Sequence, residues 1–142
     1  MKLNFLLELI ATASLGAIAW LHQFAIYPFF AQLPEEVFNP SYAKYWKGLK
    51  KILYPLLLLQ LVFFILMIVF RNYLWPEEWI LTAFIILVNL FIIFFLNHPI
   101  HKRLAQNKHA KLIGELKGLN LLTAVLWTAI LALLLSFYAG DI

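Results

Sequence analysis

The residues of this chain best suited to chemistry are its four histidines. His98 and His101 stand three residues apart, a spacing that places both side chains on one face of a regular helix. His22 lies in a separate apolar segment that a folded chain could bring to them. Three imidazoles together could bind iron, copper or haem.

Two features argue against such a metal site. Pro99 predicts a break in the helix between His98 and His101, and His101 belongs to a lysine-rich stretch that we expect to be a solvated loop. No acidic ligand stands beside these histidines. We therefore expect neither a metal nor a cofactor, and we keep haem or metal bound by His22, His98 and His101 as the alternative.

Other kinds of chemistry find no support in the residues. The chain has no cysteine, which excludes a disulfide, a thiolate metal site and a redox pair. It has no nucleophile elbow, glycine-rich phosphate loop or carboxylate pair, so neither a hydrolase nor a nucleotide-binding protein is indicated. The formal net charge is +4, but the basic residues stand at the ends of apolar segments. Anionic lipid explains them better there than a nucleic acid does.

The composition is typical of a membrane protein. Hydrophobic residues make up 64% of the chain and charged residues 13%, whereas soluble proteins are about 45–50% apolar and about 25% charged. A crossing needs about 20 residues, so the length suits one domain with four crossings. We predict an all-α polytopic membrane protein, residues 1–142 forming one bundle of four transmembrane helices, with spans at about 3–30, 49–70, 79–96 and 112–138.

The first apolar segment resembles the start of a signal peptide, because Lys2 precedes an apolar run. Glu8 interrupts that run, however, and the apolar stretch continues well past signal-peptide length. We therefore expect a retained first helix, long and tilted. Pro28 should end or bend it just after Tyr27.

Three connections join the four segments. The first, residues 33–51, is expected to carry a short amphipathic helix lying at the membrane interface. The second, residues 71–78, is expected to be a tight connection, and the third, residues 97–111, a basic loop. The interfacial aromatic residues expected in the first two connections are Phe38, Tyr42, Tyr45, Trp46, Trp75 and Trp79.

The distribution of lysine and arginine predicts the orientation. The first and third connections and the helix starts after them are rich in basic residues, whereas the opposite face has only Lys2 and Arg71. Short loops follow the positive-inside rule, so both termini should lie on the non-cytoplasmic side of the membrane. The basic residues on the cytoplasmic side are Lys44, Lys47, Lys50, Lys51, Lys102, Arg103, Lys108, Lys111 and Lys117.

Given this orientation, most polar residues of the spans fall in the cytoplasmic half, and they should turn inward and bind one another. We predict a polar pocket that opens toward the cytoplasm. Its amide and tyrosine groups would orient a ligand's oxygens, and its two tryptophans would form flat apolar walls. The predicted ligand-binding residues are Trp20, His22, Gln23, Tyr27, Gln60, Asn97, His98, Asn120 and Trp127.

Purely structural roles remain open for several of these polar residues. Asn89, Gln60 and Asn120 could hold helices together by hydrogen bonds. Gly114 and Gly118 have the spacing of close helix packing. Glu8 is expected near the outer surface, within reach of water.

Several short motifs resemble a group of uncharacterised bacterial four-helix membrane proteins, in the broad set that includes the fungal anthrone oxygenases. These motifs are HQFAIYPFF, the Phe38-x-x-x-Tyr42 spacing, LYPLLLLQL, NHPIHKRL and LNLLTAVLWT. The residues that match the family pattern are Gln23, Tyr27, Pro28, Pro99, His101, Leu104, Asn120, Trp127 and Thr128.

The chain also departs from that pattern. Leu121 stands where the family has tryptophan, Thr123 where it has arginine, and Gln60 where it has glutamate. An arginine–glutamate pair inside the bundle is thus replaced by neutral groups, which puts the family's chemistry in doubt here.

Three functions follow as hypotheses, and whether the protein is an enzyme stays open. The first is binding of an apolar small molecule, such as a quinone, polyketide or lipid, in the predicted pocket. The second, implied by the resemblance, is a cofactor-free oxygenase acting on a phenolic substrate, with His22 or His98 as the catalytic base. The third is a structural subunit of a larger membrane complex. Expected partners are membrane lipid, the small molecule, and a second copy or another membrane protein; no nucleic acid is expected.

Overall fold

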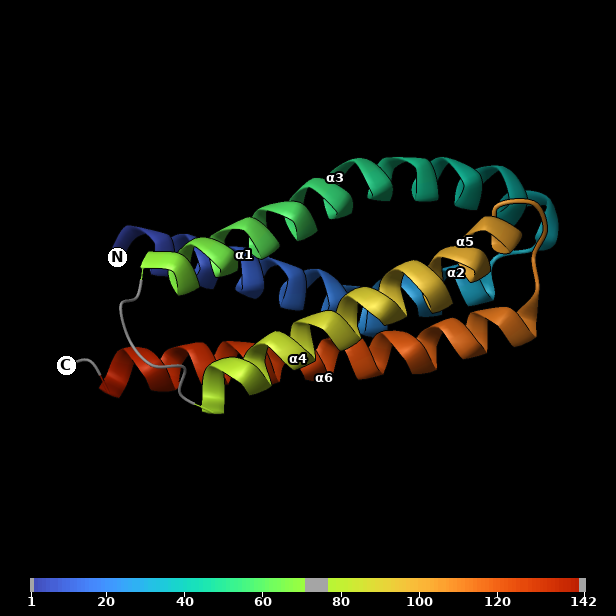
Figure 1. The fold of residues 1–142 in the computed structure, drawn as a ribbon. Coiled ribbons are helices and arrows are strands. Elements are labelled where there is room, and N and C mark those ends of the chain that lie inside the picture. The colour runs from blue at the N-terminus through green and yellow to red at the C-terminus, as the bar shows by residue number, and fades with distance from the viewer. Residues whose placement is uncertain (1, 71–76, 141–142) are drawn as a thin grey trace.

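The structure is a computed structural model that describes residues 2–70 and 77–140. All elements within these ranges are helical, and they form an elongated antiparallel bundle with both chain ends at the same end (Figure 1). The elements are α1 (Lys2–Leu21), η1 (His22–Ile26), α2 (Tyr27–Gln32), α3 (Glu35–Phe70), α4 (Glu77–Phe91), η2 (Ile92–Asn97), α5 (His98–Leu104) and α6 (Ala110–Gly140).

The predicted all-helical fold is confirmed, together with four helices that are long and apolar enough to cross a membrane. Continuous helices are formed where short elements follow one another without a break: α1, η1 and α2 make one, and α4, η2 and α5 make another. The four candidate spans are Leu3–Gln32, Glu35–Phe70, Glu77–Leu104 and Ala110–Phe137.

The first three helices extend further than the expected spans because their prolines do not end them. Pro40 lies inside α3, so the expected separate interfacial helix is instead the first part of one 36-residue helix. Pro28 and Pro99 each stand just after a π-helical segment, η1 and η2 respectively. A proline lacks one N–H and clashes with the carbonyl four residues earlier. The wider π-helical turn changes the hydrogen-bond register there, and the helix continues.

Helix α1 is the centre of the packing, because it lies against both α3 and α6, and α4 covers another side of α6. Gly16 makes the contact with α6 close: a Cβ atom there would lie 3.6 Å from Cβ of Trp127. Gly114 and Gly118, expected to pack closely, have nothing within 4 Å of such an atom. They therefore face away from the bundle.

A hydrogen-bonded polar group joins α1 to α3 inside the apolar core. The carboxylate Oε1 of Glu8 accepts bonds from Nε2 of Gln60 at 3.0 Å and from Oγ1 of Thr12 at 3.2 Å. All three side chains are fully buried. Glu8 thus lies inside the bundle, whereas we expected it to reach water, because packing on α3 turns its face of α1 inward. Asn89 is also fully buried, but its amide has no hydrogen-bond partner in the part of the chain that the structure describes.

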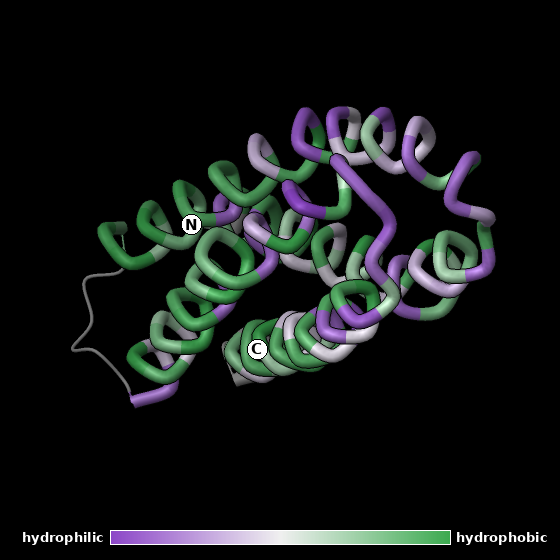
Figure 2. The backbone as a smooth tube through the Cα atoms, turned by 90° about the vertical axis from the view of Figure 1, so that its right-hand side faces the viewer, coloured by the Kyte–Doolittle hydropathy of each residue, from purple (hydrophilic) through white to green (hydrophobic). Residues whose placement is uncertain are grey.

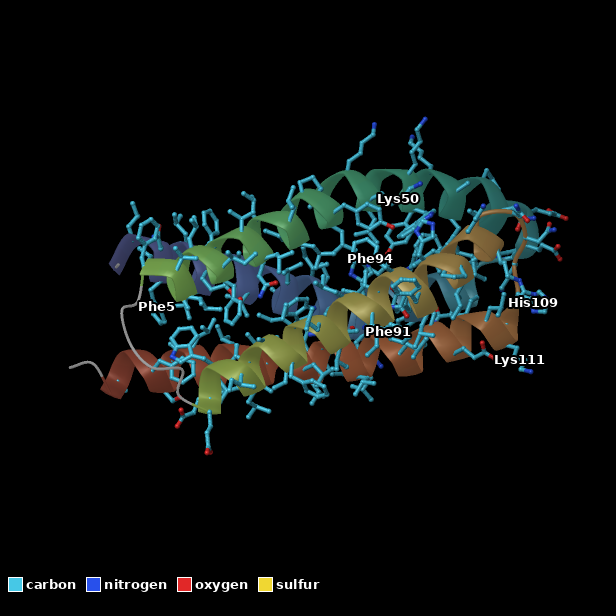
Figure 3. The ribbon with its side chains drawn as sticks, in the orientation of Figure 1. Phe5, Lys50, Phe91, Phe94, His109 and Lys111 are labelled. Carbon is cyan, nitrogen blue, oxygen red and sulfur yellow. The ribbon has the colours of Figure 1, made fainter. Side chains whose placement is uncertain are left out.

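The two ends of the bundle differ in character. Hydrophilic residues gather in the α5–α6 connection and the first part of α3 (Figure 2). Lys50, His109 and Lys111 lie toward that end, and Phe5 lies near the other (Figure 3). At the other end Trp79, expected in an interfacial belt, is buried and stacks on Phe137 with ring centroids 4.6 Å apart. The expected tight connection after α3, with Arg71 and Trp75, lies outside the described residues.

Lys108 ties the two hydrophilic connections together. Its Nζ donates hydrogen bonds to the carbonyls of Ala31 and Leu33, at 3.2 and 2.6 Å. Its backbone N–H donates to Oδ1 of Asn39 at 2.9 Å. The α5–α6 connection is thereby fixed to the carbonyl end of α2 and to the start of α3.

The Glu8–Gln60 contact gives a testable prediction about stability. Glu8→Leu and Gln60→Leu each leave a buried polar group without its partner, which should lower the free energy of unfolding by about 1–3 kcal/mol. The double variant removes both polar groups and should recover most of that loss. Unfolding of purified protein in detergent micelles measures all three variants. Additive losses in the double variant would show that the two side chains do not stabilise each other.

Candidate functional site

A small cavity lies among the helices near the hydrophilic end of the bundle. Its volume is about 40 Å³, enough for ordered water or the polar end of a ligand, because one water needs roughly 10–15 Å³ by this measure. Its walls come from α1, η1, α2, α3, η2, α5 and α6. The lining includes two tryptophans and six polar residues: Trp46, Trp127, His22, Tyr27, Asn97, His101, Asn120 and Thr123.

Five of the predicted ligand-binding residues line this cavity: His22, Tyr27, Asn97, Asn120 and Trp127. They come from three different helices, and the two π-helical segments supply two of them. His22 is the first residue of η1 and Asn97 is the last residue of η2. The change of register before each proline therefore sets the direction of these side chains, a signal that hydropathy does not carry.

The other four predicted residues lie outside the cavity wall. Gln60 is bound to Glu8 in the core, as described above. His98 accepts or donates a 2.7 Å hydrogen bond between its Nδ1 and the Tyr54 hydroxyl. Trp20 and Gln23 serve the contact between α1 and α6, where the Trp20 indole N–H donates to Oγ1 of Thr128 at 3.0 Å.

His22 belongs to the cavity wall and carries an unpaired lone pair. Its Nδ1 lies 2.6 Å from the carbonyl oxygen of Ile18. A carbonyl can only accept, so Nδ1 must carry the hydrogen and Nε2 must carry the lone pair. Nε2 is buried and has no hydrogen-bond partner among residues 2–70 and 77–140. The same holds for Oδ1 of Asn97, so two acceptors in the cavity wall lack donors.

Trp46 and His101 also line the cavity and form a cluster with Tyr42 behind them, which the sequence did not reveal. The Tyr42 hydroxyl lies 2.6 Å from Nδ1 of His101. The Trp46 ring stacks on the imidazole, with centroids 4.0 Å apart and planes 6° from parallel. His101 is only 4% exposed, although we expected it in a solvated loop, because the helix continues past Pro99 and α3 covers it.

One signal in the sequence could have revealed this cluster. Phe38, Tyr42 and Trp46 are four residues apart, which places them on one face of a helix. We assigned that face to the membrane interface. The structure buries all three side chains against α2 and α5, with Phe38 fully buried. Because α3 begins as early as Glu35, all three rings belong to it and pack against the rest of the bundle.

The metal alternative has no geometric basis in the described chain, where no three His, Cys, Asp or Glu side chains are placed to hold a metal ion.

Asn120 holds α6 against α1 beside the cavity. Its Nδ2 donates to the carbonyl of Ala19 at 2.9 Å and to Oε1 of Gln23 at 3.0 Å. Asn120→Ala removes both bonds, each worth about 0.6–2 kcal/mol between membrane helices. We expect a clear fall in melting temperature in detergent micelles. The control is Asn107→Ala in the exposed α5–α6 connection, which should melt like the wild type; equal melting of both variants would contradict the assignment.

Comparisons of the chain with family models, with curated proteins and with solved structures found no match. The resemblance to the set that includes the anthrone oxygenases therefore stays a prediction.

Proposed function

We propose that this protein is a multi-pass protein of the bacterial inner membrane that binds an apolar small molecule by its polar end. The proposed ligand belongs to the quinone, polyketide or lipid class, and its polar end occupies the cavity between His22 and His101. Both termini lie on the non-cytoplasmic side, and the cavity lies toward the cytoplasm. The basic residues at the cavity end of the bundle support this orientation (Figure 3).

The observation that carries the proposal is the pair of unpartnered acceptors in the cavity wall. Nε2 of His22 and Oδ1 of Asn97 are buried without donors in the described part of the chain. Buried polar groups that lack a partner are costly, and in native proteins they commonly await water or a ligand. A ligand that brings O–H groups to these acceptors satisfies both.

The size of the cavity limits how much of the ligand enters. Pockets that enclose whole drug-sized ligands measure about 300–1,000 Å³, whereas this cavity measures about 40 Å³. Only a small end of the ligand therefore fits, in the space that Trp46 and Trp127 help to line. The apolar remainder of the ligand lies between helices or in lipid, where its burial adds to the affinity.

Binding of decylhydroquinone tests this proposal. We expect saturable binding to the full chain in lipid nanodiscs, followed by quenching of tryptophan fluorescence, because two tryptophans line the cavity. His22→Phe keeps a ring but removes the acceptor and should weaken binding about tenfold or more, the equivalent of about 1.4 kcal/mol. Asn97→Leu should weaken it in the same direction.

The matched control is His98→Phe, the same exchange at a histidine outside the cavity wall, which should bind like the wild type. No saturable binding, or equal loss in His22→Phe and His98→Phe, would overturn the proposal.

A second candidate function is the cofactor-free oxygenase. For this function the free lone pair on His22 makes His22 the better candidate base than His98. A general base needs a free lone pair within reach of the substrate proton. Nε2 of His22 has no partner in the described chain, whereas His98 lies outside the cavity wall and its Nδ1 binds Tyr54. The third hypothesis, a structural subunit, has no such observation, because the exposed apolar side chains suit lipid equally well.

Oxygen uptake with anthrone tests the enzymatic candidate. Oxidation of one anthrone by one O₂ gives anthraquinone and water, so uptake and product should be equal. We expect His22→Ala to abolish the uptake and His98→Ala to retain it. Absence of uptake by folded wild-type protein in detergent would eliminate the oxygenase.

A further inference from the structure

We infer that the cavity is a hydroxyl site, in which His101 offers an N–H donor and His22 a lone-pair acceptor because the two imidazoles are held in opposite tautomers. This inference rests on the proposed ligand binding and narrows the ligand to phenols and alcohols. Ketones and ethers, whose oxygen can only accept, are excluded, so within the quinone class only the reduced hydroquinone form fits.

The tautomer of His22 follows from its backbone contact. Ile18 offers only a carbonyl oxygen, 2.6 Å from Nδ1, so the hydrogen is on Nδ1 and Nε2 is the acceptor. Ile18 also lines the cavity, and the contact is local, four residues back along the same helix. It therefore persists whatever occupies the cavity.

The tautomer of His101 follows from the hydrogen bonds of Tyr42. Tyr42 is buried, with only 1% of its surface exposed. Within the described residues, the one hydrogen bond of the Tyr42 hydroxyl goes to Nδ1 of His101. If that nitrogen carried the hydrogen, the tyrosine O–H would be buried without an acceptor, which is costly. Tyr42 therefore donates, Nδ1 of His101 accepts, and the imidazole hydrogen is on Nε2.

Aromatic contacts hold the His101 ring in place and bring the two imidazoles to one cavity. Trp46 stacks on His101 with centroids 4.0 Å apart, which opposes rotation of the imidazole. The Tyr27 ring lies close to both histidines, with its centroid 5.2 Å from that of His22 and 6.3 Å from that of His101. All four of these side chains line the cavity.

A hydroxyl group is the ligand end that satisfies both nitrogens, directly or with one bound water. Its oxygen accepts from Nε2–H of His101 and its hydrogen goes to Nε2 of His22. A ketone or ether oxygen leaves the His22 lone pair unpaired. A site whose buried groups bind a hydroxyl discriminates strongly against an analogue without the hydroxyl. This discrimination is much stronger than that of an apolar pocket against an analogue that lacks one methylene.

The first experiment reads the tautomers of the full chain in nanodiscs without ligand, from the ring ¹⁵N chemical shifts of labelled histidines, each assigned by replacing its residue. We expect Nδ1–H at His22 and Nε2–H at His101. Tyr42→Phe should give a mixture of tautomers at His101. The matched control, Tyr54→Phe, should change only the signals of His98. An Nδ1–H form of His101 in the wild type overturns the inference even if Tyr42→Phe does not fold.

The second experiment compares nonylphenol with its methyl ether, two probes that differ only in the hydroxyl hydrogen and one methyl group. We expect the phenol to bind about tenfold or more tightly, and His22→Phe to remove most of that difference. Equal binding of both probes overturns the hydroxyl site but leaves ligand binding intact. Binding of neither overturns the proposed function and the ligand assignment together, while the ¹⁵N spectra still decide whether the tautomers are opposite.

Discussion

The structure depends on one constraint: a polar side chain inside an apolar helix must find its partner on another helix or on the backbone of its own. Glu8 meets Gln60 across the α1–α3 contact, and Asn120 meets Ala19 and Gln23 across the α1–α6 contact. These bonds define which residues of neighbouring helices stand at the same level. The apolar side chains alone would tolerate several registers.

Buried side-chain atoms without a partner in the described chain lie both in the apolar core, at Glu8, Gln60 and Asn89, and in residues of the cavity wall. The cavity wall combines satisfied groups with two acceptors that lack donors, one on η1 and one on η2. Both π-helical segments precede a proline, at Pro28 and Pro99. The same irregularity that lets each helix continue past its proline also turns a polar side chain toward the cavity.

Hydropathy was sufficient to predict four apolar helices. It also predicted that His22, Asn97 and Asn120 lie at a similar depth and face the inside of the bundle. It could not predict the register between helices. For this reason Gln60 was expected in the pocket, although in the structure it is hydrogen-bonded to Glu8 in the core. The prolines led the prediction to end helices too early. Proline at position 99 suggested a loop, and the loop assignment in turn placed His101 in water. A period of four in aromatic residues was visible but fits an interface as well as a core, so the cluster around Trp46 needed coordinates.

Lys108 gives the hydrophilic end a mechanical property. Its three hydrogen bonds, to Ala31, Leu33 and Asn39, cross from the α5–α6 connection to the junction of α2 and α3. Separating the two connections would break all three bonds, so the bonds resist that separation. A proposed ligand that entered through these connections would have to break the Lys108 bonds, whereas entry between neighbouring helices would leave them intact.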